Sequence, residues 1–187
     1  MKIYDILKKE HQEVFTILKT LHAAPPSKRA PLRKKLLDEM TAHSIAEDNV
    51  LYDRMEQALP IKSRDIILEA REEHLSMTRA LEDLALLRVE DERFPAKVKS
   101  ILDIVQHHVQ GEEGHLFATA RDIFDDEIAE NFAGEYMAAK DAVMRTPLVI
   151  RFGKARAKKA IENVGAMLRP GAEKRETPAT PAADKRV

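Results

Sequence analysis

The chain has 187 residues and 44% hydrophobic content, which is enough for one domain with its own core plus an appendage. It contains no cysteine, which excludes disulfides, thiolate nucleophiles and Cys-type zinc or iron–sulfur sites, so any metal must be held by nitrogen and oxygen. The net charge of −1 is the sum of an acidic part and a basic part. Residues 1–144 have 20 Lys and Arg against 28 Asp and Glu, about −8, and residues 145–187 have 11 Lys and Arg against 4 Asp and Glu, about +7.

The beginning of the chain, MKIYDILKKEHQEV, is charged and helical in character. It has no apolar stretch followed by a small-residue cleavage site, and no run approaches the roughly 18 apolar residues that a membrane span needs. We therefore expect a cytoplasmic protein without a transmembrane segment.

Four long segments with apolar residues at helical spacing follow one another along the chain. We expect these helices at about residues 2–22, 31–59, 62–88 and from Pro95 onward. Short turn signals separate them, and Pro95 suits the first turn of a helix. Short connections between long amphipathic helices predict an all-α, up-down-up-down antiparallel four-helix bundle.

We expect this bundle to occupy residues 1–122 and a helical extension to occupy 123–168. In the extension a fifth helix is expected at about 125–144, and a sixth, basic from 145, starts at Pro147. Residues 169–187 are rich in Pro, Ala and charge without apolar periodicity, which predicts a disordered tail.

The basic segment could bind a protein partner, an anionic membrane surface or nucleic acid, or dock on the acidic bundle. No aromatic interleaving or DNA-reading motif supports nucleic acid, and docking within the chain is the default expectation.

Six polar residues interrupt the apolar faces of the four segments: His11, His43, Glu47, His74, His108 and Glu112. Because a helix repeats its face every three or four residues, each of them is expected to point inward. The four histidines lie roughly 14 to 17 residues from the turns that flank them, and at about 1.5 Å per residue the mismatch is only a few ångströms. In an antiparallel bundle they therefore meet in one layer.

Two HxxxE pairs, His43 with Glu47 and His108 with Glu112, place an imidazole and a carboxylate one turn apart on the same face. A single inward histidine is more often a core residue with a backbone partner, and an exposed HxxxE is usually an ion pair. Burying all six groups without partners would be very costly, however, and metal coordination compensates for it. Four nitrogens and two carboxylates suit iron or manganese, and zinc also fits.

At these residues the chain resembles the hemerythrin-like HHE cation-binding domains, over about residues 1–122. The motifs are His11 in KKEHQEV, His43 and Glu47 in HSIAEDNVLY, His74 in EEHLSM, and His108 and Glu112 in HVQGEEGHLF. The resemblance implies a four-helix bundle that holds two iron ions in an oxo- or hydroxo-bridged, non-haem centre. It also implies that Glu47 and Glu112 bridge the irons, with His11 and His43 on one and His74 and His108 on the other.

The chain departs from the oxygen-carrying hemerythrins at two places. Their third helix carries HxxxH, whereas the residue four after His74 is Thr78, and they bridge with an Asp five after the last histidine, where this chain has Glu112 at four and Glu113 at five. The missing imidazole leaves an open or water-filled coordination position. That favours a site that reacts with or senses oxygen, peroxide, nitric oxide or iron supply over simple reversible oxygen carriage.

Three further histidines have weaker claims. His115 lies roughly on the core face and forms Glu-x-x-His with Glu112, the motif that ferritin-like centres need twice, but no second copy exists. It remains an alternative ligand, or a hydrogen-bond partner of one. His107 is expected on the surface, and His22 lies too far along its helix to reach the same metals.

The leading functional hypothesis is a non-haem di-iron protein that senses, scavenges or stores oxygen, peroxide or nitric oxide. Enzymatic handling of peroxide or nitric oxide at this centre is left open. The alternative is a regulatory module whose metal occupancy reports iron or redox state to a protein partner, through the basic segment. A third interpretation is a metal-free helical protein with satisfied core histidines.

Overall fold

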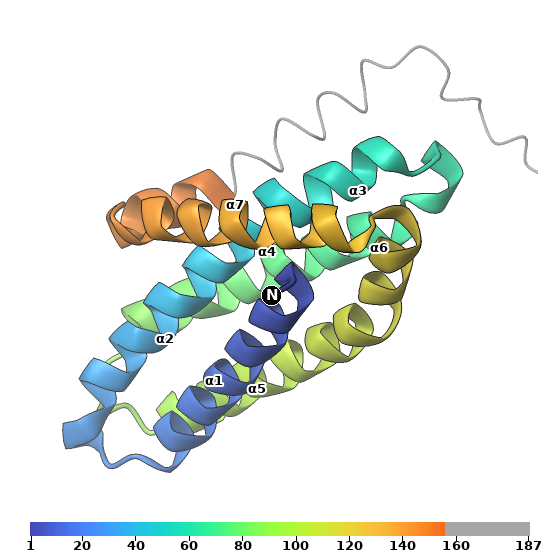
Figure 1. The fold of residues 1–187 in the computed structure, drawn as a ribbon. Helices are drawn as coiled ribbons and strands as arrows, with labels where there is room; N and C mark the ends of the chain where they lie inside the picture. The colour runs from blue at the N-terminus through green and yellow to red at the C-terminus, as the bar shows by residue number, and fades with distance from the viewer. Residues whose placement is uncertain (156–187) are drawn as a thin grey trace, which may run out of the picture.

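The computed structural model describes residues 1–155, and these residues are helical with no strand (Figure 1). Four antiparallel rods form the body. They are α1 (Ile3–Ala23); α2 (Pro26–Glu47) continued by the π-helical turn η1 (Asp48–Tyr52) and α3 (Asp53–Ala58); α4 (Asp65–Leu86), after the short 3-10 turn η2 (Ile61–Ser63); and α5 (Phe94–Gly111) continued by the π-helical turn η3 (Glu112–Leu116) and α6 (Phe117–Ile123). The predicted all-α bundle is confirmed.

The second rod begins at Pro26, earlier than the expected start at Pro31, which lies inside the helix. Proline is well suited to the first helical position, where its missing N–H would have no partner anyway. Arg29 then fixes this first turn: it is buried, and its guanidinium donates to the carbonyl oxygens of Ala24 (2.9 Å) and Val89 (2.6 Å). The expected start was therefore wrong because these hydrogen bonds, of which the one to Val89 is a tertiary contact, extend the helix back to Pro26.

Two apolar clusters fill the bundle, one on each side of a polar layer. On α1, Leu7 belongs to one cluster and Val14 to the other, and His11 lies between them. On α4, Ala70 and Met77 are divided in the same way. The polar layer is consequently closed off along the bundle axis by close-packed side chains, which keep water away from it.

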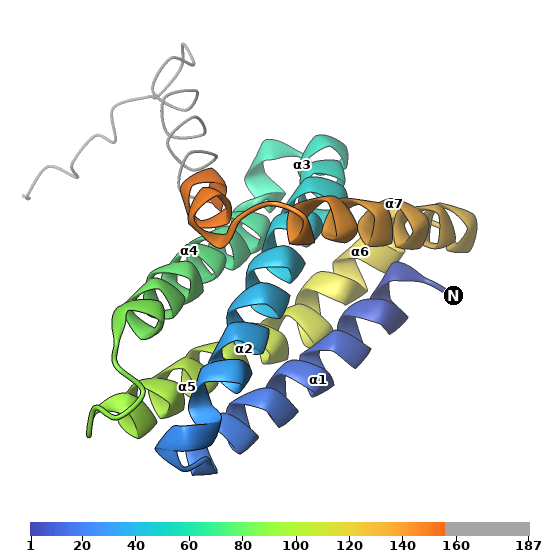
Figure 2. The ribbon, with the colours of Figure 1, turned by 90° about the vertical axis from the view of Figure 1, so that its left-hand side faces the viewer.

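Helix α7 (Asp126–Met144) crosses the bundle near the end that carries α3 and α6, and it packs on α1 and α2 (Figure 2). It begins where the side chain of Asp125 accepts a hydrogen bond from the N–H of Ile128 (2.9 Å), a typical N-cap. Phe132 and Tyr136 on α7 belong to the same apolar cluster as Leu7. The expected fifth helix is therefore present and is part of the core.

After Pro147 the chain is helical again from residue 148 to residue 155. Arg151 is buried there, and its guanidinium contacts Asp38 Oδ1 (2.5 Å) and Thr41 Oγ1 (2.9 Å) on α2. The described start of the basic segment thus docks on the bundle. The rest of the expected sixth helix, up to Leu168, and the expected disordered tail at 169–187 lie outside the described residues. Within residues 1–155, no helix combines the length and apolar character needed to cross a membrane.

Candidate metal centre

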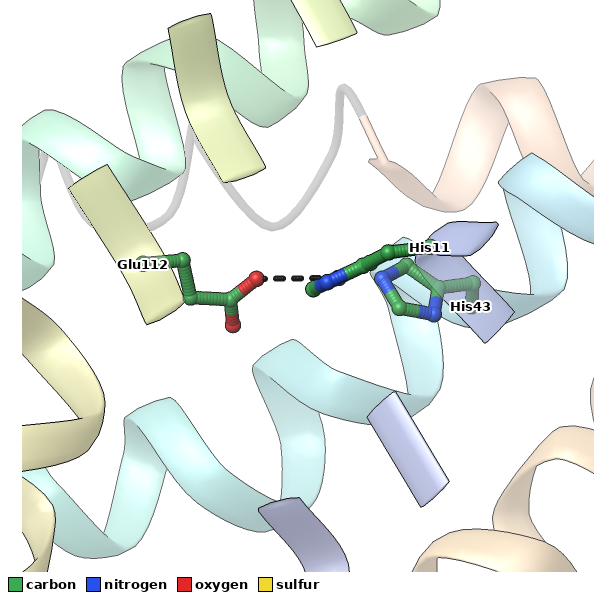
Figure 3. A group of neighbouring side chains, drawn as sticks. All are labelled: His11, His43 and Glu112. Carbon is green, nitrogen blue, oxygen red and sulfur yellow. Dashed lines mark ion pairs between the residues drawn. The ribbon is translucent and has the colours of Figure 1, made fainter. Parts of the chain in front are cut away.

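The structure brings all six predicted residues together between the two apolar clusters. None is more than 6% exposed: His11, His43, Glu47, His74, His108 and Glu112. They form two groups, and within each group one nitrogen or oxygen of every residue lies within 4.8 Å of the others. The first group is His11, His43 and Glu112 (Figure 3), and the second is Glu47, His74 and His108.

The two carboxylates connect these groups. Glu47 Oε2 lies 3.5 Å from His43 Nε2 and 3.4 Å from His74 Nε2. Glu112 Oε2 lies 3.1 Å from His11 Nε2 and 3.5 Å from His108 Nε2. Each carboxylate therefore faces one imidazole from each group, as a ligand shared by two cations would.

Several of these atoms make no well-directed hydrogen bond within the described part of the chain, although His11 Nε2 and Glu112 Oε2 lie 3.1 Å apart as an ion pair. The atoms without such a bond are both oxygens of Glu47, Glu112 Oε2, His11 Nε2 and His74 Nδ1. Buried polar atoms in folded proteins are almost always satisfied, so this concentration of unsatisfied atoms at one point needs an explanation. Apart from His74 Nδ1, whose ring faces the site with Nε2, these atoms converge in one buried layer. Oxygen and imidazole donors arranged in this way are the donor set of a cation site, and the residues present fit a pair of metal ions.

The two carboxylates also share a backbone feature, because each lies at the junction of an α-helix and a π-helical turn. Glu47 is the last residue of α2, before η1, and Glu112 is the first residue of η3. A π turn holds an extra residue and is frequent at functional sites. Within η3 the helix face is shifted, so Leu116 is buried while His115 is exposed. The expectation that His115 lies roughly on the core face was therefore wrong.

Arg71 of α4 holds the first π turn in place. Its side chain is buried, and its three guanidinium nitrogens contact Asp48 Oδ1 (3.1 Å), Asp53 Oδ1 (2.6 Å) and Glu56 Oε2 (2.5 Å). One guanidinium thus ties the first residue of the π turn, Asp48, to two carboxylates of the helix that follows it, Asp53 and Glu56. A single arginine among many charged residues gave no signal of this role in the sequence.

Three of the four histidines are oriented by a carboxylate at their outer nitrogen. The pairs are His11 Nδ1 with Glu113 Oε1 (2.8 Å), His43 Nδ1 with Glu10 Oε2 (3.0 Å), and His108 Nδ1 with Glu73 Oε2 (2.9 Å). Metal-binding histidines usually have such a partner, which fixes the ring and its tautomer and leaves Nε2 free to bind. Sequence reasoning missed Glu10 and Glu73, although each directly precedes a candidate ligand and so lies near the same layer.

His74 is oriented differently. Its ring stacks on that of Tyr52, with centroids 5.2 Å apart and planes inclined by 19°. The Tyr52 hydroxyl donates to Glu112 Oε1 at 3.3 Å. One turn after His74, Thr78 is buried at the position where an oxygen carrier has a further histidine. His107 is 76% exposed, and His22 is exposed with Nδ1 3.0 Å from the carbonyl of Pro95, so both lie outside the site as expected.

The protonation states of the site follow from its burial. Burial, together with the neighbouring Glu112 carboxylate, raises the pKa of Glu47 well above its usual range. Burial also opposes ionisation of Glu112, but Glu47 and the imidazoles of His11 and His108 hold its pKa well below the usual range. Burial and the neighbouring His108 lower the pKa of His74, so its imidazole is neutral. Without metal, the Glu47–Glu112 pair thus keeps one proton, on Glu47, and binding of cations would release it.

A pocket of about 320 Å³ opens on the surface between α4 and the α5–η3 rod and reaches Glu112. Its polar lining includes Glu69, Glu73, His107 and His115. The pocket offers small molecules a polar approach to the layer of candidate ligands.

Comparisons with known proteins agree with this geometry. The sequence pattern described as "Hemerythrin HHE cation binding domain" matches residues 2–120. The chain is 30% identical over 146 residues to a protein named "DNA nickase" from Nostoc sp. (strain PCC 7120 / SAG 25.82 / UTEX 2576); the match covers 78% of this chain but only 41% of that protein. The fold of the present chain is similar to that in the crystal structure of a hemerythrin HHE cation binding domain-containing protein, an Rv2633c homolog from Mycobacterium kansasii. That likeness has a TM-score of 0.69 at 19% identity and covers 83% of this chain and 99% of the other.

Proposed function

The chain belongs to the hemerythrin HHE cation-binding family, and on this basis we propose that it holds two iron ions bridged by Glu47 and Glu112. His11 and His43 serve one ion, and His74 and His108 serve the other. The observation that carries the proposal is the position of the two carboxylates, each facing one imidazole of both groups. Imidazole and carboxylate donors without sulfur suit iron, and manganese or zinc would meet the same donors.

We further propose that the centre interacts with oxygen, peroxide or nitric oxide, in sensing, scavenging or storage. Bound iron would supply Lewis-acid and redox chemistry toward such small molecules. The chain contributes the surroundings: two apolar clusters exclude water, and the pocket beside Glu112 gives access from the α4–α5 side. Thr78 brings no imidazole to the His74 side, so a metal held there would keep a coordination position for an exogenous ligand.

Metal analysis tests the proposal directly. Protein loaded anaerobically with ferrous iron and then desalted should retain two irons per chain, and azide or peroxide should produce a charge-transfer band. The double variant Glu47→Ala, Glu112→Ala should lose both properties, whereas Glu69→Ala, an exposed glutamate beside the same pocket, should keep them. Wild-type protein that retains no iron would contradict the proposal.

The regulatory alternative is supported by the docking of the extension on the bundle, through Arg151 and helix α7. In that case metal-free and iron-loaded protein should differ in thermal stability and in proteolysis, without turnover of peroxide. The name DNA nickase belongs to a longer relative, and this chain spans only 41% of that protein's length. A nicking assay on supercoiled plasmid, with loaded and metal-free protein, tests whether that activity resides in the shared region.

A further inference from the structure

Helix α7 contacts the candidate metal centre through Tyr136. The phenol is fully buried, and its hydroxyl donates to Glu10 Oε2 at 2.6 Å. The same hydroxyl lies 3.0 Å from His43 Nδ1, and Glu10 Oε2 also lies 3.0 Å from that nitrogen. Tyr136, Glu10 and His43 therefore form a closed triangle of polar atoms, at the edge of the imidazole that faces away from Glu47.

Lys140 continues this contact one turn further along α7. Its ammonium lies 2.8 Å from Glu10 Oε1 and 2.9 Å from Glu39 Oε2, and its side chain is 12% exposed. Because Glu10 belongs to α1 and Glu39 to α2, the lysine joins the two helices that carry His11 and His43. Both oxygens of Glu10 are thus fixed by α7, one by the phenol and one by the ammonium.

His43 differs from His11 and His108 in this respect. Glu113 and Glu73, the partners of His11 and His108, come from η3 and α4, within the bundle. Around His43, α7 adds the phenol and the ammonium to Glu10, and this helix lies beyond residues 2–120, which match the family pattern. The matched residues therefore supply Glu10 but not the two groups that hold its oxygens.

We propose that Tyr136 and Lys140 are positioning residues for His43, so that helix α7 completes the cation site formed by His11, His43 and Glu112. The proposal rests on the proposed binding of two irons. It adds that the affinity for one of them depends on α7. Partners at the outer nitrogen of a metal-binding histidine typically contribute about 10- to 100-fold to metal affinity. Loss of the Tyr136 hydroxyl should lower the affinity for one iron by about this factor and leave the affinity for the other unchanged.

The full-length Tyr136→Phe variant tests this, with Tyr4→Phe as its matched control. Tyr4 is also a buried tyrosine, 2% exposed, but its hydroxyl has no hydrogen-bond partner within the described residues. Iron affinities are measured by anaerobic competition with a chelator, and melting of the metal-free form is measured in parallel. We expect one tight and one weakened iron in Tyr136→Phe, and two tight irons in Tyr4→Phe.

Lys140 provides an independent test. Lys140→Met should also lower the affinity for one iron. Lys140→Arg, which keeps a cation near Glu10, should retain most of the wild-type affinity. If Tyr136→Phe and Lys140→Met bind both irons as tightly as wild type, the positioning role is overturned while the proposed function stands, even if the metal-free form melts earlier. If wild-type protein binds no iron, the proposed function is overturned and this inference with it.

Discussion

Replacing Glu47 by leucine should shift the stabilities of the metal-free and iron-loaded protein in opposite directions. In the metal-free chain Glu47 is fully buried, and neither of its oxygens has a hydrogen-bond partner in the described structure. Because its raised pKa keeps the Glu47 carboxyl protonated, the cost of burying it is that of a polar group without a hydrogen bond, about 1–3 kcal/mol, and an apolar side chain of similar volume avoids this cost. We expect the lower half of this range, about 1–2 kcal/mol, since Glu112 and the imidazoles remain. For a chain of this length that raises the melting temperature by about 2–8 °C.

The iron-loaded protein should respond in the other direction. A ligand present at 100 times its dissociation constant stabilises the folded state by about 2.7 kcal/mol, so two irons add about 5 kcal/mol, or roughly 10–20 °C. Glu47 faces His43 and His74, one imidazole of each group, so its loss weakens both metals. The variant should therefore lose most of the stabilisation that loading gives the wild-type protein.

Thermal unfolding by calorimetry or circular dichroism, in chelator and after anaerobic loading at equal ferrous concentration, measures both effects. The control is Glu13→Leu on α1, whose side chain is 54% exposed and which should change the two forms equally. If Glu47→Leu destabilises the metal-free form by several kcal/mol, the carboxyl has a structural role that this reasoning omits. If loading still stabilises the variant as strongly as wild type, Glu47 is not a ligand.

Three further predictions concern the surroundings of the site. Arg71→Met should lower the free energy of unfolding by about 3 kcal/mol in urea titrations, because it removes the guanidinium that holds the π turn after Glu47; a change within error would contradict that role. Thr78→His should weaken azide binding by about tenfold or more in optical titrations, since an inward imidazole would compete for the open position, and unchanged affinity would show that the position lies elsewhere. Burial alone would raise the pKa of Glu10, but His43, Lys140 and Tyr136 hold it at about 2 against a usual 4.5. The ionised Glu10 side chain therefore stabilises the folded state above about pH 4.5, and this stabilisation is lost as the pH falls toward 2. Unfolding of the metal-free Glu10→Gln variant should accordingly depend less on pH than that of wild type across this interval, and parallel curves would exclude the coupling.

Apolar periodicity alone was enough to predict the four rods of the bundle and the inward position of the six candidate ligands. Because the repeat of an α-helix is fixed, the positions of Leu7 and Val14 determine that His11 lies inward, and nearly equal distances from the turns place the histidines in one layer. The start of α2 was misplaced because Pro31 is typical of a helix boundary. One of the two hydrogen bonds by which Arg29 extends the helix goes to Val89, which is distant in the sequence.

Only the tertiary structure determined which partners surround that layer. Periodicity specifies a face but not the rotation of neighbouring helices, so it could not pair Glu10 with His43, Glu73 with His108, or Tyr136 with either member of the first pair. The π turn after Gly111 also breaks the repeat, which is why His115 lies outside. The local spacing of polar and apolar residues thus determined the candidate ligands, while the packing of α4 and α7 against other helices determined what orients them.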